Sequence, residues 1–173
     1  MSLTYLTGFE TVLHLCTINS SKYSINIKTQ NKKTTKENTA ITVEATVNAP
    51  VEKVWEFWGG PQHITKWCNA SDDWHAPHAE NDLRTGGKFS TRMEAKDGSF
   101  GFDFGGVYDN VKANELIEYT MGDNRKVKIV FSKEGNATKV TETFDAENQN
   151  PIEMQRGGWQ AILNNFKSYT ESN

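Results

Sequence analysis

The last stretch of the chain, residues 150–171, constrains the fold most, because it has the pattern of one long amphipathic helix. Asn150 is expected to cap this helix, with Pro151 in its first position and Glu153 as the capping-box partner. Its apolar face follows the three-and-four spacing of a helix and carries Gln155, Trp159, Ile162, Leu163, Phe166 and Tyr169. About 21 residues make a rod of roughly 31 Å. Such a helix must bury that face against the rest of the chain.

Residues 39–149 contain short alternating runs, which are typical of antiparallel strands joined by tight turns. Strands are expected around residues 39–48, 89–94, 100–104, 117–121, 127–131 and 140–144. Between the first two, Pro50 opens a short helix that ends at Gly59, and a second short helix carries Trp67. Residues 69–78 are expected to be irregular. The pattern predicts an α+β domain, with a curved antiparallel sheet of about six or seven strands wrapped around the C-terminal helix.

The first 38 residues differ in composition from the rest of the chain. They hold two weak strand-like patches, 12–18 and 23–27, and then the polar run 28–36, which lacks apolar periodicity. We therefore expect residues 1–38 to be a partly disordered N-terminal extension, with a polybasic tether as the alternative. Residues 39–173 are expected to form one domain.

The composition excludes several classes of function. The 173-residue chain has a net charge of −3 and no basic stripe interleaved with aromatic residues, so it is not expected to bind nucleic acid. The apolar run 11–18 is too short to span a bilayer, so no membrane insertion is expected. Cys16 and Cys68 lie far apart, which fits reduced thiols in the cytoplasm better than a disulfide framework.

Several short motifs resemble those of a known protein family. They are Asn48–Trp55 (NAPVEKVW), the segment around Trp67, Gly86–Phe89 (GGKF), Gly105–Tyr108 (GGVY) before Ile117–Tyr119 (IEY), and Gly157–Trp159 (GGW). Together they resemble the SRPBCC superfamily, which contains START proteins and birch-pollen allergens and has the helix-grip fold. Within it, the chain is similar to the branch related to the C-terminal domain of the activator of heat-shock protein 90 ATPase. The resemblance covers residues 40–172.

The resemblance implies a deep cavity between the long helix and the concave face of the sheet. Independently, the inward positions are rich in aromatic residues and methionine, which fill a curved sheet less tightly than branched aliphatic side chains. Phe100, Phe102 and Phe104 are expected on one inner face, after which Gly105 and Gly106 allow a bulge. A filled core is the alternative. The expected ligand-binding residues are Trp67, Phe89, Met93, Phe102, Phe104, Tyr119, Phe131, Glu142 and Trp159.

Glu142 is the most informative of these residues, because it alternates in register with Val140 and Phe144 and so points into the apolar interior. A carboxylate there is costly unless it is paired, and desolvation raises its pKa. We expect Glu142 to anchor a ligand or to act as a general acid or base. The alternatives are a salt bridge to Arg92, Arg156 or a lysine, and exposure near the end of the strand.

Other kinds of chemistry are not indicated. The possible metal ligands Cys68, Asp72, Asp73, His75 and His78 fit no structural zinc spacing, so a polar loop at the cavity mouth is expected. The sequence contains no Gly-x-Ser-x-Gly elbow and no nucleotide-binding glycine loop after a strand. We therefore expect no metal, no cofactor and no catalytic nucleophile.

Three functions remain. The first is the binding of a small, largely apolar or aromatic molecule in the cavity. The second, implied by the resemblance, is a protein-interaction role with a chaperone partner; it needs an exposed apolar patch, and the sequence shows no obvious one. The third is an enzyme of the cyclase or aromatase type, for which Glu142, Tyr119 and Tyr108 are the candidate acid–base groups.

Overall fold

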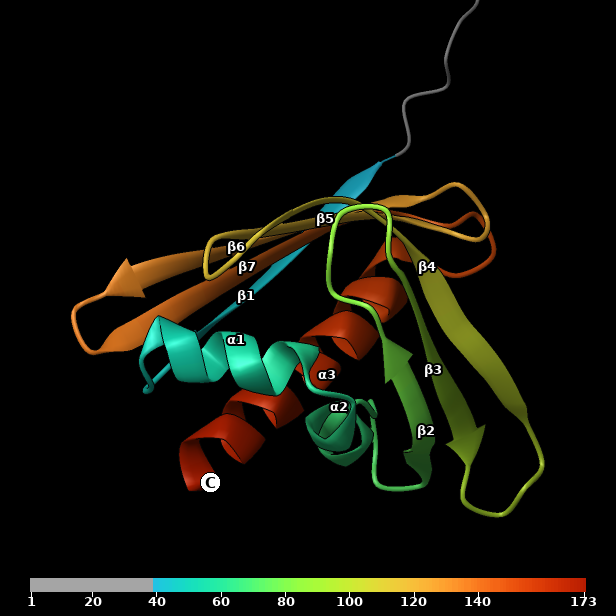
Figure 1. Cartoon of the computed structure of the whole chain (residues 1–173). Coiled ribbons are helices and arrows are strands. Elements are labelled where there is room, and N and C mark those ends of the chain that lie inside the picture. Colours follow the sequence, from blue (N-terminus) through green and yellow to red (C-terminus); the bar gives the residue numbers. More distant parts are fainter. Residues whose placement is uncertain (1–38) are drawn as a thin grey trace, which may run out of the picture. The chain divides into compact units, whose positions relative to one another are not determined.

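The structure, a computed structural model, describes residues 39–173 as an α+β domain (Figure 1). Its elements are β1 (Ala40–Val47), α1 (Val51–Gly59), α2 (Pro61–Trp67), β2 (Trp74–Asn81), β3 (Lys88–Ala95), β4 (Gly101–Lys112), β5 (Leu116–Met121), β6 (Lys126–Glu134), β7 (Ala137–Asp145) and α3 (Ile152–Ser172). The predictions for residues 1–38 lie outside the described residues. In the described part, no helix has the length and apolar character needed to cross a bilayer.

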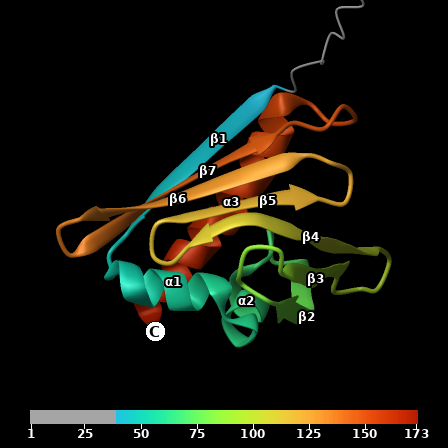
Figure 2. The same ribbon diagram turned by 45° about the horizontal axis from the view of Figure 1, so that its top comes forward.

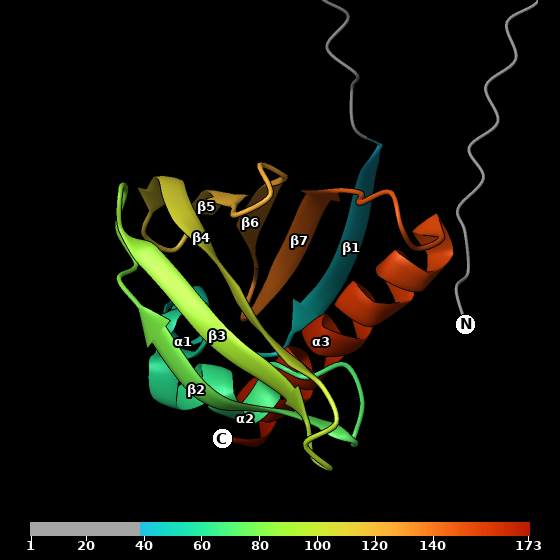
Figure 3. The same ribbon diagram turned by 90° about the vertical axis from the view of Figure 1, so that its right-hand side faces the viewer.

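The seven strands form one antiparallel sheet in the order β1-β7-β6-β5-β4-β3-β2. Strands β2 to β6 each pair with the next strand along the chain, and β1 adds to the far edge beside β7. Figure 2 shows α3 crossing behind β1, β7 and β6, and Figure 3 shows the sheet curling over the helices. The predicted class, a curved antiparallel sheet around a C-terminal helix with two short helices after the first strand, is confirmed.

The core lies between α3 and the concave face of β1, β5, β6 and β7. In β7 every second residue from Thr138 to Phe144 is buried. The largest fully buried apolar side chains are Phe144, Phe166, Ile41, Ile117, Ile129 and Leu163. Burial of each such side chain contributes about 1.5–3 kcal/mol, so the strands and the helix stabilise each other.

Polar side chains attach α3 to the free edge of β1. Arg156, Gln160 and Lys167 each donate a hydrogen bond to a backbone carbonyl of β1, at 3.0, 3.1 and 2.6 Å. The acceptors belong to the alternate residues 42, 44 and 46, whose carbonyls lie on the unpaired side of this edge strand. The helix thereby covers an edge that would otherwise be open to further strands. It is also held toward the β1 side of the sheet.

The N-terminus of α3 differs from the prediction. The helix begins at Ile152, and no side chain caps it. The side chain of Asn150 instead donates to the Glu147 carboxylate at 2.8 Å. Gln155 reaches back from the first turn and donates to the carbonyl oxygens of Glu147 and Asn150 at 3.2 and 2.8 Å. The predicted cap is wrong because the Asn150 side chain bonds to Glu147, and Gln155 bonds to the backbone that precedes the helix.

Strand β2 occupies part of the segment 69–78 that the sequence predicts to be irregular, so that prediction is wrong. The strand pairs with β3 at the edge of the sheet, with a register shift between His75 and His78. Pro77 lies in this gap. Proline is tolerated in edge strands and at bulges, and here it interrupts the alternation by which a strand is recognised.

Aromatic residues near the β3–β4 turn are partly or largely exposed. The prediction that Phe100 shares an inner face with Phe102 and Phe104 is wrong, because β4 begins only at Gly101. The side chain of Phe100 is 62% exposed and that of Phe102 is 44% exposed. The rings of Trp74, Phe100 and Phe102 lie with their centroids 6.0, 6.1 and 6.2 Å apart. We call these three residues the aromatic tip.

The bulge expected at glycines 105–106 lies further along β4, between Tyr108 and Asn110. Tyr108 faces the concave side and is buried. Gly106 has a different role, because a Cβ atom there would lie 2.5 Å from the backbone oxygen of Thr120 and 3.1 Å from the ring of Phe89. The absence of a side chain at this position leaves room for that ring.

Candidate functional site

A cavity of about 400 Å³ lies between the concave face of the sheet and the helices. All three helices and strands β2 to β7 contribute to its lining. The cavity exists because α3 lies against β1 and does not fill the space beneath β3, β4 and β5. Binding sites for drug-sized molecules measure roughly 300–1,000 Å³, so this cavity is large enough for a small ligand.

Most of the residues predicted to bind a ligand line this cavity. The lining includes Trp67, Phe89, Met93, Phe102, Phe104, Tyr119, Glu142 and Trp159. Phe131 is the exception, because its ring packs against Trp55 and Trp58, with centroid distances of 5.3 and 5.6 Å. It faces inward as predicted, but helix α1 covers it. The alternation in β6 indicates which face a residue occupies and not what packs on it.

Ring-to-ring contacts hold the aromatic walls in place. The Phe89 ring lies 4.8 Å from that of Tyr119 and 5.1 Å from that of Tyr108. On the opposite wall, Trp159 stacks on Phe144 with centroids 3.9 Å apart. The Tyr108 hydroxyl also donates to Asn81 Oδ1 at 2.7 Å. These contacts give the cavity fixed walls rather than a collapsible interior.

Glu142 points from β7 into the cavity, as predicted, and only 7% of it is exposed. Its partners across the sheet are the apolar residues Val43 of β1 and Ile129 of β6. Burial raises the pKa of its carboxyl group from 4.5 to about 8. The group is therefore mainly protonated at neutral pH, and burial of the carboxyl is the cause.

The proposed ion pairs of Glu142 are absent from the described part of the chain. Arg92 pairs instead with Glu94 at 3.1 Å and Asp103 at 3.4 Å. Arg156 lies on the other side of the sheet edge and donates to a β1 carbonyl. Within residues 39–173, neither a lysine nor any other side chain forms an ion pair or a hydrogen bond with Glu142. The salt-bridge alternative is therefore wrong.

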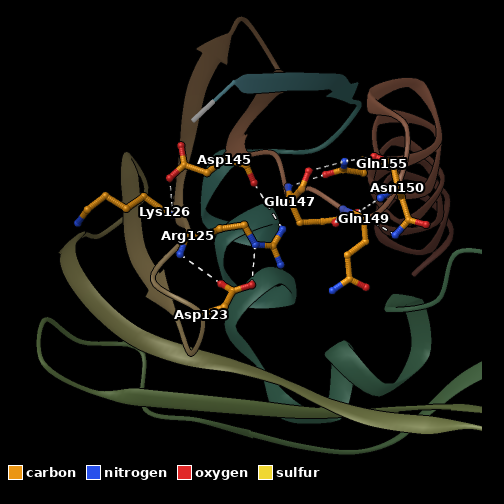
Figure 4. Close-up of polar contacts among 8 residues, drawn as sticks. All are labelled: Asp123, Arg125, Lys126, Asp145, Glu147, Gln149, Asn150 and Gln155. Atoms are coloured by element: carbon orange, nitrogen blue, oxygen red, sulfur yellow. Dashed lines mark hydrogen bonds and ion pairs between the residues drawn. The ribbon is translucent and has the colours of Figure 1, made fainter. Parts of the chain in front are cut away.

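One end of the cavity is polar, and the sequence did not indicate it. This end is lined by Arg125, Glu147, Asn150 and Gln155 (Figure 4). Arg125 Nε lies 2.7 Å from Asp123 Oδ2, and Arg125 Nη1 donates to the last carbonyl of β7 at 3.4 Å. The backbone N–H groups that follow Glu147 donate to its carboxylate and lower its pKa. The one available signal was Gln155, a polar residue on the apolar face of α3.

The segment from Cys68 to His78 does not gather into a metal site. Cys68 Sγ donates to Met93 Sδ at 3.6 Å, and burial, followed by the field of Glu142, raises the pKa of the thiol to about 12. His75 lies 3.6 Å from Glu94. Among the residues that the structure describes, no three His, Cys, Asp or Glu side chains lie close enough to share a metal ion.

The raised pKa of Glu142 makes the stability of the protein depend on pH. The unfolded chain releases this proton near pH 4.5 and the folded protein near pH 8, so folding takes up a proton between these values. Stability therefore falls as pH rises through this window, by at most about 1.4 kcal/mol per pH unit. We expect Glu142→Gln to gain stability over the wild type from pH 5 to pH 8 and to keep a constant advantage above pH 8, measured by urea denaturation.

The matched control is Glu118→Gln, which changes a carboxylate on the outer face of β5 that pairs with Lys128 at 3.5 Å. This variant should not show the growing advantage. A difference between Glu142→Gln and the wild type that stays the same from pH 5 to pH 9 would contradict the raised pKa.

Solved structures with the same architecture are known. An AHSA1-like protein from Aeromonas hydrophila is 43% identical over 78% of this chain and 93% of its own, with a TM-score of 0.73. A protein from Cytophaga hutchinsonii is 64% identical over 77% of this chain and 92% of its own, with a TM-score of 0.68. A protein from Chromobacterium violaceum shares the fold at 22% identity over 78% of this chain and 99% of its own, with a TM-score of 0.71.

A comparison with curated proteins gives no match. The profile of the family described as "Activator of Hsp90 ATPase homolog 1-like protein" matches residues 48–171, which is most of the chain. The motifs, the fold and this match agree, and the resemblance drawn from the sequence is confirmed. The chain belongs to the family of activator of Hsp90 ATPase homolog 1-like proteins.

Proposed function

We propose that this protein binds a small, largely apolar molecule in the cavity between α3 and the sheet, without a cofactor. The observation that carries the proposal is the unfilled volume of about 400 Å³ beside Trp159. Protein interiors are normally packed as densely as organic crystals, so a void of this size forgoes contacts that its lining would otherwise make. A ligand of matching shape restores those contacts.

The titratable groups of the lining favour binding over acid–base catalysis. Burial raises the pKa of Glu142 to about 8 and that of Cys68 to about 12, and it raises the pKa of Tyr119 well above its usual value. Glu142 has the protonation state of a general acid at neutral pH, but Cys68 and Tyr119 are protonated as well, so these three groups supply no general base to complete an acid–base pair. We therefore do not extend the proposal to a cyclase or aromatase activity.

A second candidate is a protein-interaction role of the kind that the family description suggests. The observation that favours it is the aromatic tip, where Phe100 is 62% exposed and Phe102 is 44% exposed. The sequence shows no obvious exposed apolar patch, whereas these rings are exposed in the structure. Clustered exposed rings are typical of interaction sites. A cytoplasmic location, inferred from the two widely separated cysteines, fits either function.

The second candidate makes a testable prediction for Phe100→Ser, which removes an exposed ring outside the cavity lining. Purified heat-shock protein 90 on a resin should retain the wild type and lose most of that retention with the variant. Val107→Ser is the control, since Val107 is 40% exposed on the outer side of β4. If the resin does not retain the wild type, the protein-interaction role with heat-shock protein 90 is contradicted.

The leading proposal is tested by filling the cavity from β6. Ile129 lines the cavity, whereas its neighbour Val130 has the opposite orientation on the strand. We expect the neutral fluorescent probe N-phenyl-1-naphthylamine to bind the wild type, and Ile129→Phe to weaken that binding at least about tenfold, equivalent to ~1.4 kcal/mol. Val130→Phe should bind the probe as the wild type does.

Circular dichroism and thermal melting establish that each variant is folded. Leu163→Phe fills the same space from α3 and serves if Ile129→Phe does not fold. No fluorescence increase with the wild type, or equal binding by the filled and control variants, would overturn the proposal.

A further inference from the structure

Among the described residues, three buried polar side chains that line the cavity have no hydrogen-bond partner. They are Glu142 on β7, Tyr119 on β5 and Thr91 on β3, and each is more than nine-tenths buried. The carboxylic acid and the phenol are stronger donors than the aliphatic hydroxyl of Thr91. Among the described residues, the only sealed side-chain polar atom without a partner is Oγ1 of Thr170. The oxygens of Glu142 and Tyr119 are therefore not sealed in the core, and they face the open space of the cavity.

The two groups lie on the same concave face. Glu142 pairs across the sheet with Ile129 of β6, and Ile129 pairs with Ile117 of β5, two residues before Tyr119. The two side chains thus project from next-nearest strands with a diagonal offset of two residues. The field of Glu142 acts on both Tyr119 and Cys68. Both side chains line the same cavity.

When Glu142 is protonated, its carboxyl group and the hydroxyl group of Tyr119 are both hydrogen-bond donors. A buried donor without an acceptor is destabilising, and the penalty is removed when an acceptor arrives. A carbonyl oxygen has two lone pairs and can accept from two donors at once. A purely hydrocarbon ligand would leave both donors unpaired, and an amine would bring further donors.

We propose that the ligand is an uncharged, mainly apolar molecule whose carbonyl or hydroxyl oxygen accepts hydrogen bonds from Glu142 and Tyr119. This inference rests on the proposed binding function and specifies the chemical class of the ligand. The apolar body lies against the aromatic walls, and the oxygen lies between the two donors. A cationic amine is the competing class, because it would pair with an ionised Glu142.

The hydrogen bond to the ligand depends on the protonation of Glu142 alone between pH 6 and pH 9. The other titratable groups of the described lining are Cys68, Tyr108, Tyr119, Arg125 and Glu147. Burial raises the pKa of the thiol and of both phenols, hydrogen bonds lower that of Glu147, and arginine is a permanent cation. The neighbours of Glu142 on β1 and β6 are apolar, and α3 contributes no charged side chain to the lining.

Three probes of nearly the same shape test the ligand class. They are 2-acetonaphthone, which has a carbonyl oxygen, 2-isopropenylnaphthalene, which has none, and 1-(2-naphthyl)ethylamine, which is a cation. Each displaces N-phenyl-1-naphthylamine from the protein at pH 6, 7 and 9. We expect the wild type to bind the ketone about tenfold more tightly than the hydrocarbon at pH 6. This preference should shrink at pH 9, where Glu142 has lost its proton.

Substitutions at the two donors separate their contributions. Glu142→Leu should bind the hydrocarbon but lose most of the preference for the ketone at every pH. Glu142→Gln retains an N–H donor, so its preference should persist and become independent of pH. Tyr119→Phe removes the second donor and should reduce the preference while leaving its pH dependence in place.

The possible outcomes are distinct. Equal binding of ketone and hydrocarbon by the wild type overturns this inference and leaves the proposed function intact. A preference for the amine over the ketone at pH 6 also overturns it, because Glu142 would then act as an anion at a pH where the inference requires it to be protonated. If neither the probes nor N-phenyl-1-naphthylamine bind, the proposed function fails and this inference fails with it.

Discussion

The attachment of α3 to the edge of β1 determines how the interior is divided. Seven strands spaced about 4.8 Å apart span roughly 29 Å, whereas a helix with its side chains is about 10–12 Å wide. One helix therefore cannot fill the concave face. Because Arg156, Gln160 and Lys167 hold α3 to the β1 edge, the unfilled space lies beneath β3, β4 and β5. Helices α1 and α2 close part of it, and the cavity is what remains.

The charge state of Glu142 follows from this arrangement. An unpaired carboxylate in a dry interior is too costly, so the group keeps its proton. Arg125 lines the same cavity, but it is already held by Asp123 and by the last carbonyl of β7. The cavity thus has an aromatic body, a neutral donor within it and a charged polar end. Such a division suits a molecule that is largely apolar and carries a single polar group.

Periodicity was sufficient to predict most of the fold and much of the cavity lining. Alternation in the strands and three-and-four spacing in the last helix placed Glu142, Tyr119 and Trp159 on inner faces, where the structure has them. It could not find β2, because Pro77 breaks the alternation. Nor could it show that helix α1 covers Phe131. The polar end was missed because its residues come from two loops and the first turn of α3, and they are brought together only by the tertiary fold.

The most direct test of this account is the titration of the Glu142 side-chain carboxyl, followed by carbon-13 NMR in protein labelled at glutamate and assigned with Glu142→Gln. The account predicts a carboxyl that is protonated at neutral pH, with a pKa of about 8. Adding 2-acetonaphthone should raise that pKa further, because the bound ketone stabilises the protonated form. A pKa near the ordinary value of 4.5 would mean that Glu142 is ionised at neutral pH, and it would contradict the neutral donor that the cavity is proposed to offer its ligand.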